Sequence, residues 1–86
     1  MRVPTGSQPT PGAFAKAISA EVRSAMARQR VSGAELARMI GRSQNYLARR
    51  LRDDVPLSAN DIEDICEVLG QDLPELVIAA AHAIET

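Results

Sequence analysis

Apolar residues recur along this chain at helical spacing, and no segment alternates as a half-buried strand would. Between residues 13 and 29 apolar side chains return every three or four positions, which predicts a helix over this range with one buried stripe. Thr10 before Pro11 leaves an earlier start of the helix open. The expected buried stripe consists of Phe14, Ile18, Val22, Ala25 and Met26.

A second helix is predicted to begin at residue 33. Ser32, followed three residues later by Glu35, has the spacing of a capping box, in which each residue satisfies a backbone N–H of the other. Gly41 permits the left-handed backbone conformation that ends such a helix in a tight turn. The side chains expected to face inward are Leu36, Ala37 and Ile40.

The third predicted helix runs from residue 44 to about residue 52. Ser43 is its expected N-cap, and Leu47 and Leu51 would anchor it from beneath. Ala37, four residues before Gly41, is small enough to let this helix approach the preceding one closely. Such spacing is typical of a helix-turn-helix, in which a tight turn joins two short helices.

Two further helices are predicted in the last third of the chain. Residues 53–56 break the chain, Ser58 and Asp61 form a second capping box, and Gly70 ends the helix that they begin. Asp72 is the expected cap of the last helix. Residues available for packing are Ile62, Ile65, Cys66 and Leu69 in the fourth helix, and Leu76, Val77, Ala80 and Ile84 in the fifth. The sequence therefore predicts an all-α fold of five helices.

The composition of the chain bears on its domain organisation and on its place in the cell. Residues 1–12 are rich in Pro and Gly, so we expect a disordered arm, either a plain tail or a segment whose Arg2 enters a minor groove. Residues 13–86 form one domain, with 45% apolar residues in the whole chain but only 2% aromatic ones. Cys66 is the single cysteine, and no run is apolar enough for a signal peptide or a membrane span. We expect a soluble cytoplasmic protein.

The net charge of −1 conceals two halves of opposite sign. All ten Lys and Arg lie in residues 1–52, against only Glu21 and Glu35, which leaves that half at +8. Residues 53–86 hold nine acidic residues and no Lys or Arg. Either the two halves attract each other across one surface, or the basic half faces a phosphate backbone, which responds to the local field.

The third helix and the turn before it carry side chains suited to nucleic acid. Gln and Asn pair with adenine through two hydrogen bonds, and Arg pairs with guanine in the same way. Arginines elsewhere on the helix would hold phosphates, and Tyr46 either donates its hydroxyl to a phosphate or packs its ring on the domain edge. The expected base-reading residues are Ser43, Gln44, Asn45 and Arg49, and the expected phosphate ligands are Arg38, Arg42, Arg50 and Arg52 together with Tyr46.

The stretches SGAELARMIGRSQNYLARRL and PLSANDIEDICEVLGQDLPEL resemble the lambda-repressor-like (Cro/C1-type, XRE) family of DNA-binding domains over about residues 13–81. The resemblance implies that the third helix enters the major groove, with Gln44 contacting a base near its start. Family members often carry Gln where this chain has Gly33, and that Gln holds a phosphate. Ser32 or a nearby backbone N–H is the expected replacement here.

The resemblance implies a sequence-specific regulator of transcription that binds a double-stranded DNA operator, of the phage Cro or repressor type or a bacterial equivalent. Such proteins pair as symmetric dimers. The apolar run of the fifth helix either forms that dimer surface or belongs to the core, and a monomer that pairs only on DNA is the other possibility. The alternative is a protein-interaction module, an antitoxin or adaptor, that uses the acidic half. We expect no enzyme, cofactor or metal site, because His82 and Cys66 are too few ligands for a metal.

Overall fold

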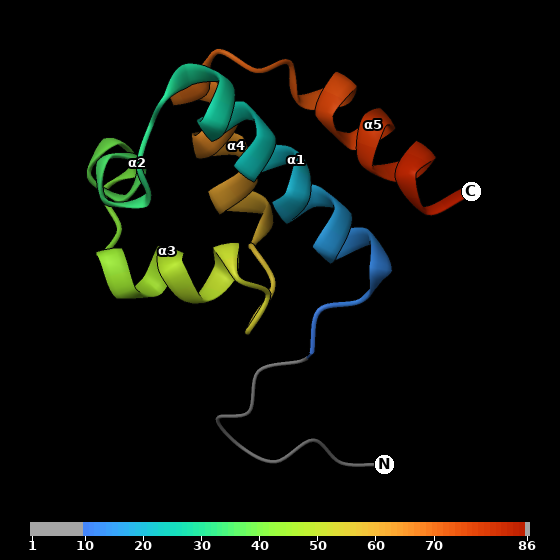
Figure 1. The fold of residues 1–86 in the computed structure, drawn as a ribbon, viewed down its shortest axis with the longest axis horizontal. Helices are drawn as coiled ribbons and strands as arrows, with labels where there is room; N and C mark the ends of the chain where they lie inside the picture. Colours follow the sequence, from blue (N-terminus) through green and yellow to red (C-terminus); the bar gives the residue numbers. More distant parts are fainter. Residues whose placement is uncertain (1–9, 86) are drawn as a thin grey trace.

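The computed structural model describes residues 10–85, and this part of the chain is all-α (Figure 1). Helix α1 runs through the middle of the domain, α5 packs along one side of it, and α2 and α3 lie on the other side. The predicted arm at residues 1–12 falls largely outside the described residues. The helices are α1 (Ala13–Gln29), α2 (Gly33–Ile40), α3 (Gln44–Leu51), α4 (Ala59–Leu69) and α5 (Leu73–Glu85).

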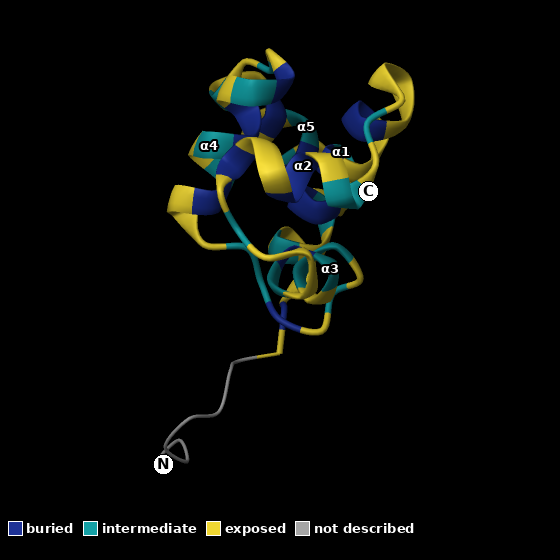
Figure 2. Ribbon diagram, turned by 90° about the vertical axis from the view of Figure 1, so that its left-hand side faces the viewer, coloured by how far each residue is buried: buried dark blue, intermediate teal, exposed yellow. Residues whose placement is uncertain are grey.

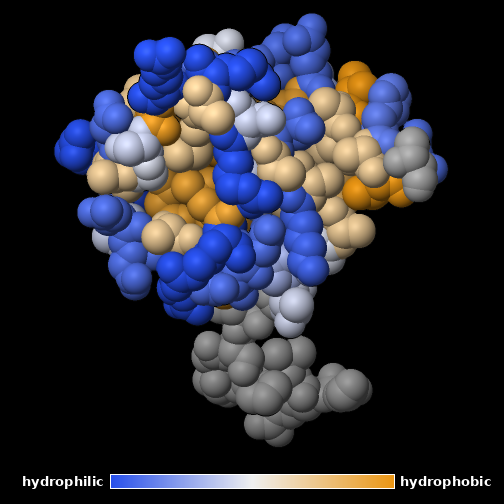
Figure 3. Space-filling model, viewed as in Figure 1, coloured by the Kyte–Doolittle hydropathy of each residue, from blue (hydrophilic) through white to orange (hydrophobic). Residues whose placement is uncertain are grey.

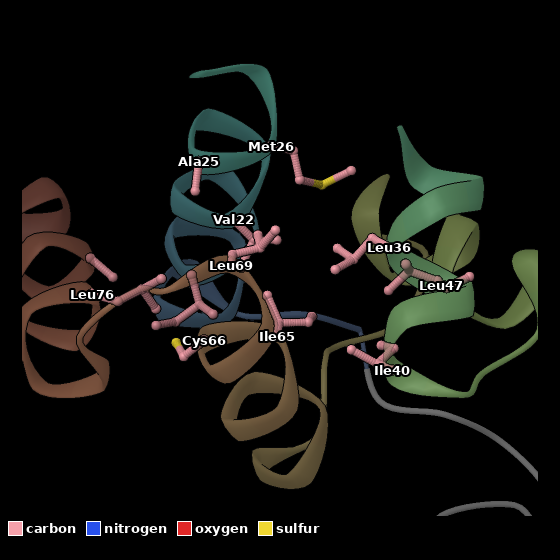
Figure 4. Close-up of a cluster of buried hydrophobic side chains, with 13 residues drawn as sticks. Val22, Ala25, Met26, Leu36, Ile40, Leu47, Ile65, Cys66, Leu69 and Leu76 are labelled. Atoms are coloured by element: carbon pink, nitrogen blue, oxygen red, sulfur yellow. The ribbon is translucent and has the colours of Figure 1, made fainter. Parts of the chain in front are cut away.

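One hydrophobic core joins the five helices. Figure 4 shows side chains from every helix pointing into it, and Figure 2 shows the buried faces turned inward. Burying a valine, leucine or isoleucine side chain stabilises a fold by about 1.5–3 kcal/mol relative to leaving it exposed, so these contacts determine how the helices pack. Helix by helix in chain order, Val22, Leu36, Leu47, Ile65 and Leu76 belong to this core.

The helix ends form as their local sequences predict. The Ser32 Oγ accepts from the Glu35 N–H at 3.1 Å, and the Glu35 carboxylate accepts from the Ser32 N–H at 3.1 Å, which completes the capping box of α2. Gly41 ends α2 with φ of 71°, a backbone conformation that favours glycine. Asp72 caps α5 by accepting from the Glu75 N–H at 3.0 Å.

Three apolar residues expected in the core lie at the surface. Phe14 is 42% exposed because the buried stripe of α1 starts one turn later, at Ala17 and Ile18. Val77 and Ile84 on α5 are 37% and 46% exposed, since they lie at the edge of the strip through which α5 packs on α1 and α4, where Leu76 and Ala80 are buried. Helix α1 begins at Ala13 with Gly12 as its N-cap, so the earlier start that Thr10 and Pro11 left open does not occur.

The C-terminal end of α3 is tied to α1 by polar contacts. Asp53, just beyond α3, adopts the left-handed conformation with φ of 65°, which is uncommon for a residue other than glycine. Its Oδ1 accepts from the buried Ser19 hydroxyl at 2.7 Å. Arg23 lies one turn further along α1, where it donates to the Leu51 carbonyl at 2.6 Å. These bonds fix where α3 ends.

The N-terminal half of α3 is tied to α4 by a buried carboxylate. Asp61, only 1% exposed, accepts from the Tyr46 hydroxyl at 2.8 Å, from Arg42 Nε at 3.1 Å and from the Ser58 N–H at 3.0 Å. Burial alone would raise the pKa of the Asp61 carboxyl. The hydrogen bonds from Ser58 and Tyr46 and the charge of Arg42 outweigh burial, so this pKa lies below its ordinary value.

The lowered pKa of Asp61 predicts a specific loss of stability in acid. An aspartate whose pKa is depressed on folding stabilises the fold above its unfolded pKa of about 3.9, and this contribution disappears as pH falls through the folded value. At pH 7, Asp61→Asn should cost about 2 kcal/mol of unfolding free energy, because it removes the charged acceptor of the Tyr46 and Arg42 hydrogen bonds and leaves Arg42 paired with Asp64 alone. The measurement is urea denaturation of both proteins from pH 7 down to pH 2.

The difference in unfolding free energy between the two proteins should shrink as pH falls below the unfolded pKa of Asp61. A difference that stays constant over this range would contradict the assignment of a charged, structural role to this carboxylate.

Candidate nucleic-acid interface

Helix α3 is short and packs on the core through one side, so the direction of its exposed side is fixed. Leu47 is fully buried beneath it, and the Ser43 Oγ accepts from the Tyr46 N–H at 3.0 Å at its start. Eight residues are too few for an isolated helix to be stable in water, so this helix depends on its packing and its caps. Its outward side chains are therefore presented on a fixed support.

The four residues predicted to read bases all lie at the surface of α3 or its cap. Asn45 and Arg49 are one helical turn apart and share a face, and Gln44 precedes them at the first position of the helix. Within the described part of the chain, the side chains of these three residues make no hydrogen bond or ion pair. Ser43 uses its oxygen as the cap, which leaves its hydroxyl hydrogen able to donate.

The chemistry of this face fits base edges in a major groove. The amides of Gln44 and Asn45 each offer a donor and an acceptor, the pair that adenine N7 and N6 require. The guanidinium of Arg49 offers parallel donors for guanine O6 and N7. A B-form major groove is wide enough to admit one α-helix, and α3 is exposed along the side that carries these groups.

Three of the expected phosphate ligands have partners inside the domain. Arg42 bonds Asp61 and also lies 2.8 Å from a carboxylate oxygen of Asp64. The Tyr46 hydroxyl donates to Asp61, and the guanidinium of Arg50 stacks 3.5 Å over the Tyr46 ring. Only 14% of the Arg50 side chain is exposed. The carboxylates that bind Arg42 and Tyr46 lie on α4, a contact between distant segments that helical periodicity does not predict, whereas Arg50 packs on Tyr46 one turn earlier in α3.

The remaining expected phosphate ligands are accessible. Ser32 and Arg38 are exposed on and beside α2. Arg52, 61% exposed, pairs with Asp54 at 2.7 Å, a surface contact of a kind that stabilises by less than about 1 kcal/mol and is readily exchanged. A Cβ placed on Gly33 would meet only the Leu51 Cδ1 at 4.0 Å, so the backbone at the start of α2 is not crowded.

The other residues considered for chemistry lie apart from this face. Cys66 is 3% exposed within the core, and burial, followed by the nearby charge of Asp72, raises the pKa of its thiol. His82 is exposed on α5. Over residues 10–85 no group of three or more His, Cys, Asp or Glu side chains gathers as a metal site would require. None of the helices in this range has the length and apolar character of a membrane span.

Comparison with known proteins agrees with this arrangement. The sequence model of a family described as a helix-turn-helix domain matches residues 17–77, which is most of the chain. No curated protein matches the chain.

Two crystal structures of the clp gene regulator ClgR share the fold. The structure from Corynebacterium glutamicum has a TM-score of 0.77 and 28% sequence identity, and the match covers 90% of this chain and 81% of that one. A second structure, from C. glutamicum, has a TM-score of 0.75 and 27% identity, and the match covers 85% of this chain and 95% of that one. The protein described here therefore belongs to the helix-turn-helix domain family, an XRE-like group of non-enzymatic, DNA-binding transcriptional regulators.

Proposed function

We propose that this protein is a sequence-specific regulator that inserts α3 into the major groove of a double-stranded DNA operator. One observation carries the proposal. Gln44, Asn45 and Arg49 are exposed on a helix that the core holds rigidly, and within residues 10–85 their side chains have no partner. Polar side chains left unpaired on a fixed support can exchange water for base edges without first breaking a contact inside the protein.

The proposed phosphate contacts come from the exposed residues at the two ends of this face. Ser32 and Arg38 of the α2 region would hold the backbone on one side, and Arg52 would hold it beyond the end of α3. Such contacts fix the register of the protein on the duplex without reading sequence. More specifically, we propose a regulator of the phage Cro or repressor type, or its bacterial equivalent.

Helix α5 is the proposed dimer surface. Val77, Ile78 and Ile84 leave an apolar side of this helix exposed, and Figure 3 shows apolar side chains gathered on the side of the molecule that α5 forms. Two copies joined there would present two α3 helices to half-sites about one helical turn apart, either already in solution or only when both sit on DNA. Exposed apolar area of this kind marks interaction surfaces more often than isolated exposed side chains do.

A protein-interaction module is the second candidate function. An open groove between α2 and α4 is lined by Met39, Ile40, Asp64, Glu67 and Val68. Its mixed apolar and acidic lining suits a basic, amphipathic partner, as an antitoxin or adaptor would bind.

The DNA-binding proposal predicts the effect of removing single base-reading groups. Gln44→Ala and Arg49→Ala should each weaken binding to a sequence selected from a random DNA pool by about tenfold, the loss of one good bidentate base contact. Arg28→Ala is the matched control, because Arg28 is an exposed arginine in the last turn of α1, away from α3. Affinities are measured by fluorescence anisotropy at one fixed salt concentration.

Arg28→Ala should leave the preference for the selected sequence unchanged. If selection enriches no sequence, the proposed function is wrong and the interaction module gains support. If a sequence is enriched but both α3 variants bind it as the unmodified protein does, another face of the protein reads the DNA.

The dimer proposal predicts that a charge on the exposed side of α5 separates the copies. Ile78→Glu places a carboxylate at a position that is 53% exposed, so the fold should persist while pairing in solution or on DNA is lost. Met39→Glu, at a 47% exposed position of α2, is the control and should pair normally. Sedimentation of the protein alone and with an operator duplex measures both forms of pairing. Equal stoichiometry for the three proteins would rule out α5 as the dimer surface.

A further inference from the structure

Asp61 accepts hydrogen bonds from polar groups that lie between α3 and the rest of the domain. Its two carboxylate oxygens receive the Tyr46 hydroxyl at 2.8 Å and Arg42 Nε at 3.1 Å. Arg50 Nε lies 3.8 Å from the same carboxylate and makes no hydrogen bond. One buried acid thus faces two arginines and a tyrosine from the turn before α3 and from α3 itself.

We infer that Asp61 is a positioning residue for sequence discrimination: it fixes the orientation of α3 and holds Arg42 and Arg50 back from the DNA phosphates. This inference rests on the proposed function, because it assumes that α3 reads base edges. It assigns specificity to a residue on α4 that is 1% exposed and therefore has no surface to offer DNA.

The first part of the inference concerns geometry. Leu47 anchors α3 through apolar contact, which has no preferred direction and allows a short helix to rotate or slide. Hydrogen bonds are directional, and α3 is held by them at both ends, by Asp61 at its start and by Ser19 and Asp53 beyond its last turn. Bidentate contacts with bases tolerate only small errors in position, so this double attachment preserves them.

The second part concerns the two arginines. A guanidinium that reaches a phosphate raises affinity for every sequence alike, because phosphate contacts carry no base information. Arg42 is shared between Asp61 and Asp64, and Arg50 is stacked on Tyr46 with 14% of its side chain exposed. Both cations are therefore compensated within the protein, which keeps non-specific binding low while Arg49 remains free to read a base.

The test compares binding to a selected duplex with binding to a scrambled duplex over a salt series. For Asp61→Asn we expect the preference for the selected sequence to fall by about tenfold, the equivalent of one bidentate contact. We also expect the salt dependence of scrambled-duplex binding to steepen by about 0.9 for each released arginine that gains a phosphate. A variant that is merely less stable would change neither quantity once it is folded.

Two controls separate the alternatives. Glu63→Gln removes one exposed negative charge from the same helix, so it measures the general effect of charge on binding. Leu76→Ala opens a cavity on α5, which packs on α1 and α4, and so lowers stability without touching α3. Both should retain the preference of the unmodified protein for the selected duplex. Circular dichroism at the binding temperature establishes that each variant is folded.

Tyr46→Phe tests the inference even if Asp61→Asn does not fold. It removes only the hydroxyl that donates to Asp61 and keeps the ring on which Arg50 stacks. We expect weaker binding to the selected duplex and unchanged binding to the scrambled one. If the hydroxyl instead held a phosphate, Tyr46→Phe would weaken both equally, and that result would overturn the inference.

Failure of the inference differs from failure of the proposed function. If the unmodified protein shows no preference for any duplex, the proposed function fails. If it shows a preference that both Asp61→Asn and Tyr46→Phe retain in full, α3 reads DNA without help from Asp61, and the inference alone is overturned.

Discussion

The buried carboxylate of Asp61 holds α3, the helix that we propose faces DNA, against α4 in one orientation. Removing a charged group from water is costly unless hydrogen bonds and an opposite charge replace the lost hydration. Asp61 obtains these from Tyr46, Arg42 and the Ser58 N–H, and each donor comes from a different segment of the chain. Satisfying one acid therefore holds α3, the turn before it and the start of α4 in one arrangement.

Because Asp61 fixes the orientation of α3, the arginines near the end of this helix lie in different surroundings. A helix with three arginines near its end looks at first like a uniform phosphate-binding surface. The structure divides these arginines, because Arg50 faces inward onto Tyr46, Arg49 is exposed, and Arg52 lies at the rim beside Asp54. The basic and acidic halves of the sequence meet in ion pairs such as that of Arg42 with Asp61, while Arg49 stays exposed for the contact with DNA that we propose.

Local patterns in the sequence predicted most of the fold. The caps at Ser32 and Ser58 and the glycine ends of α2 and α4 depend on residues within four positions of each other, and the structure contains them as predicted. Leu47 was predictable as an anchor because helical periodicity places it on the inner side of α3. Phe14 followed the same periodicity yet is exposed, because periodicity gives the direction of a side chain but not how far the core extends.

The contacts that position the site could not be predicted from the sequence. Asp61 and Tyr46 are 15 residues apart, and Ser19 and Asp53 are 34 apart, so their bonds exist only after the helices pack. Asp61 is also a complete member of a capping box, and that local role explained its presence fully. The exposed residues of α3 were predictable in type, since Gln, Asn and Arg carry the donor geometry that bases require. Their freedom from internal partners is a property of the folded domain.

The central claim, that the exposed side of α3 reads DNA bases, is tested most directly by nuclear magnetic resonance. The protein carries side-chain amides at Gln44 and Asn45 on α3, and others at Gln29 and Gln71, which bond the Leu69 carbonyl away from α3. On titration with a selected duplex, the account predicts shifted signals for the amides of Gln44 and Asn45 and the guanidinium of Arg49, with little change at Gln29 and Gln71. Shifts confined to α4 and α5, with Gln44, Asn45 and Arg49 unchanged at saturation, would contradict it.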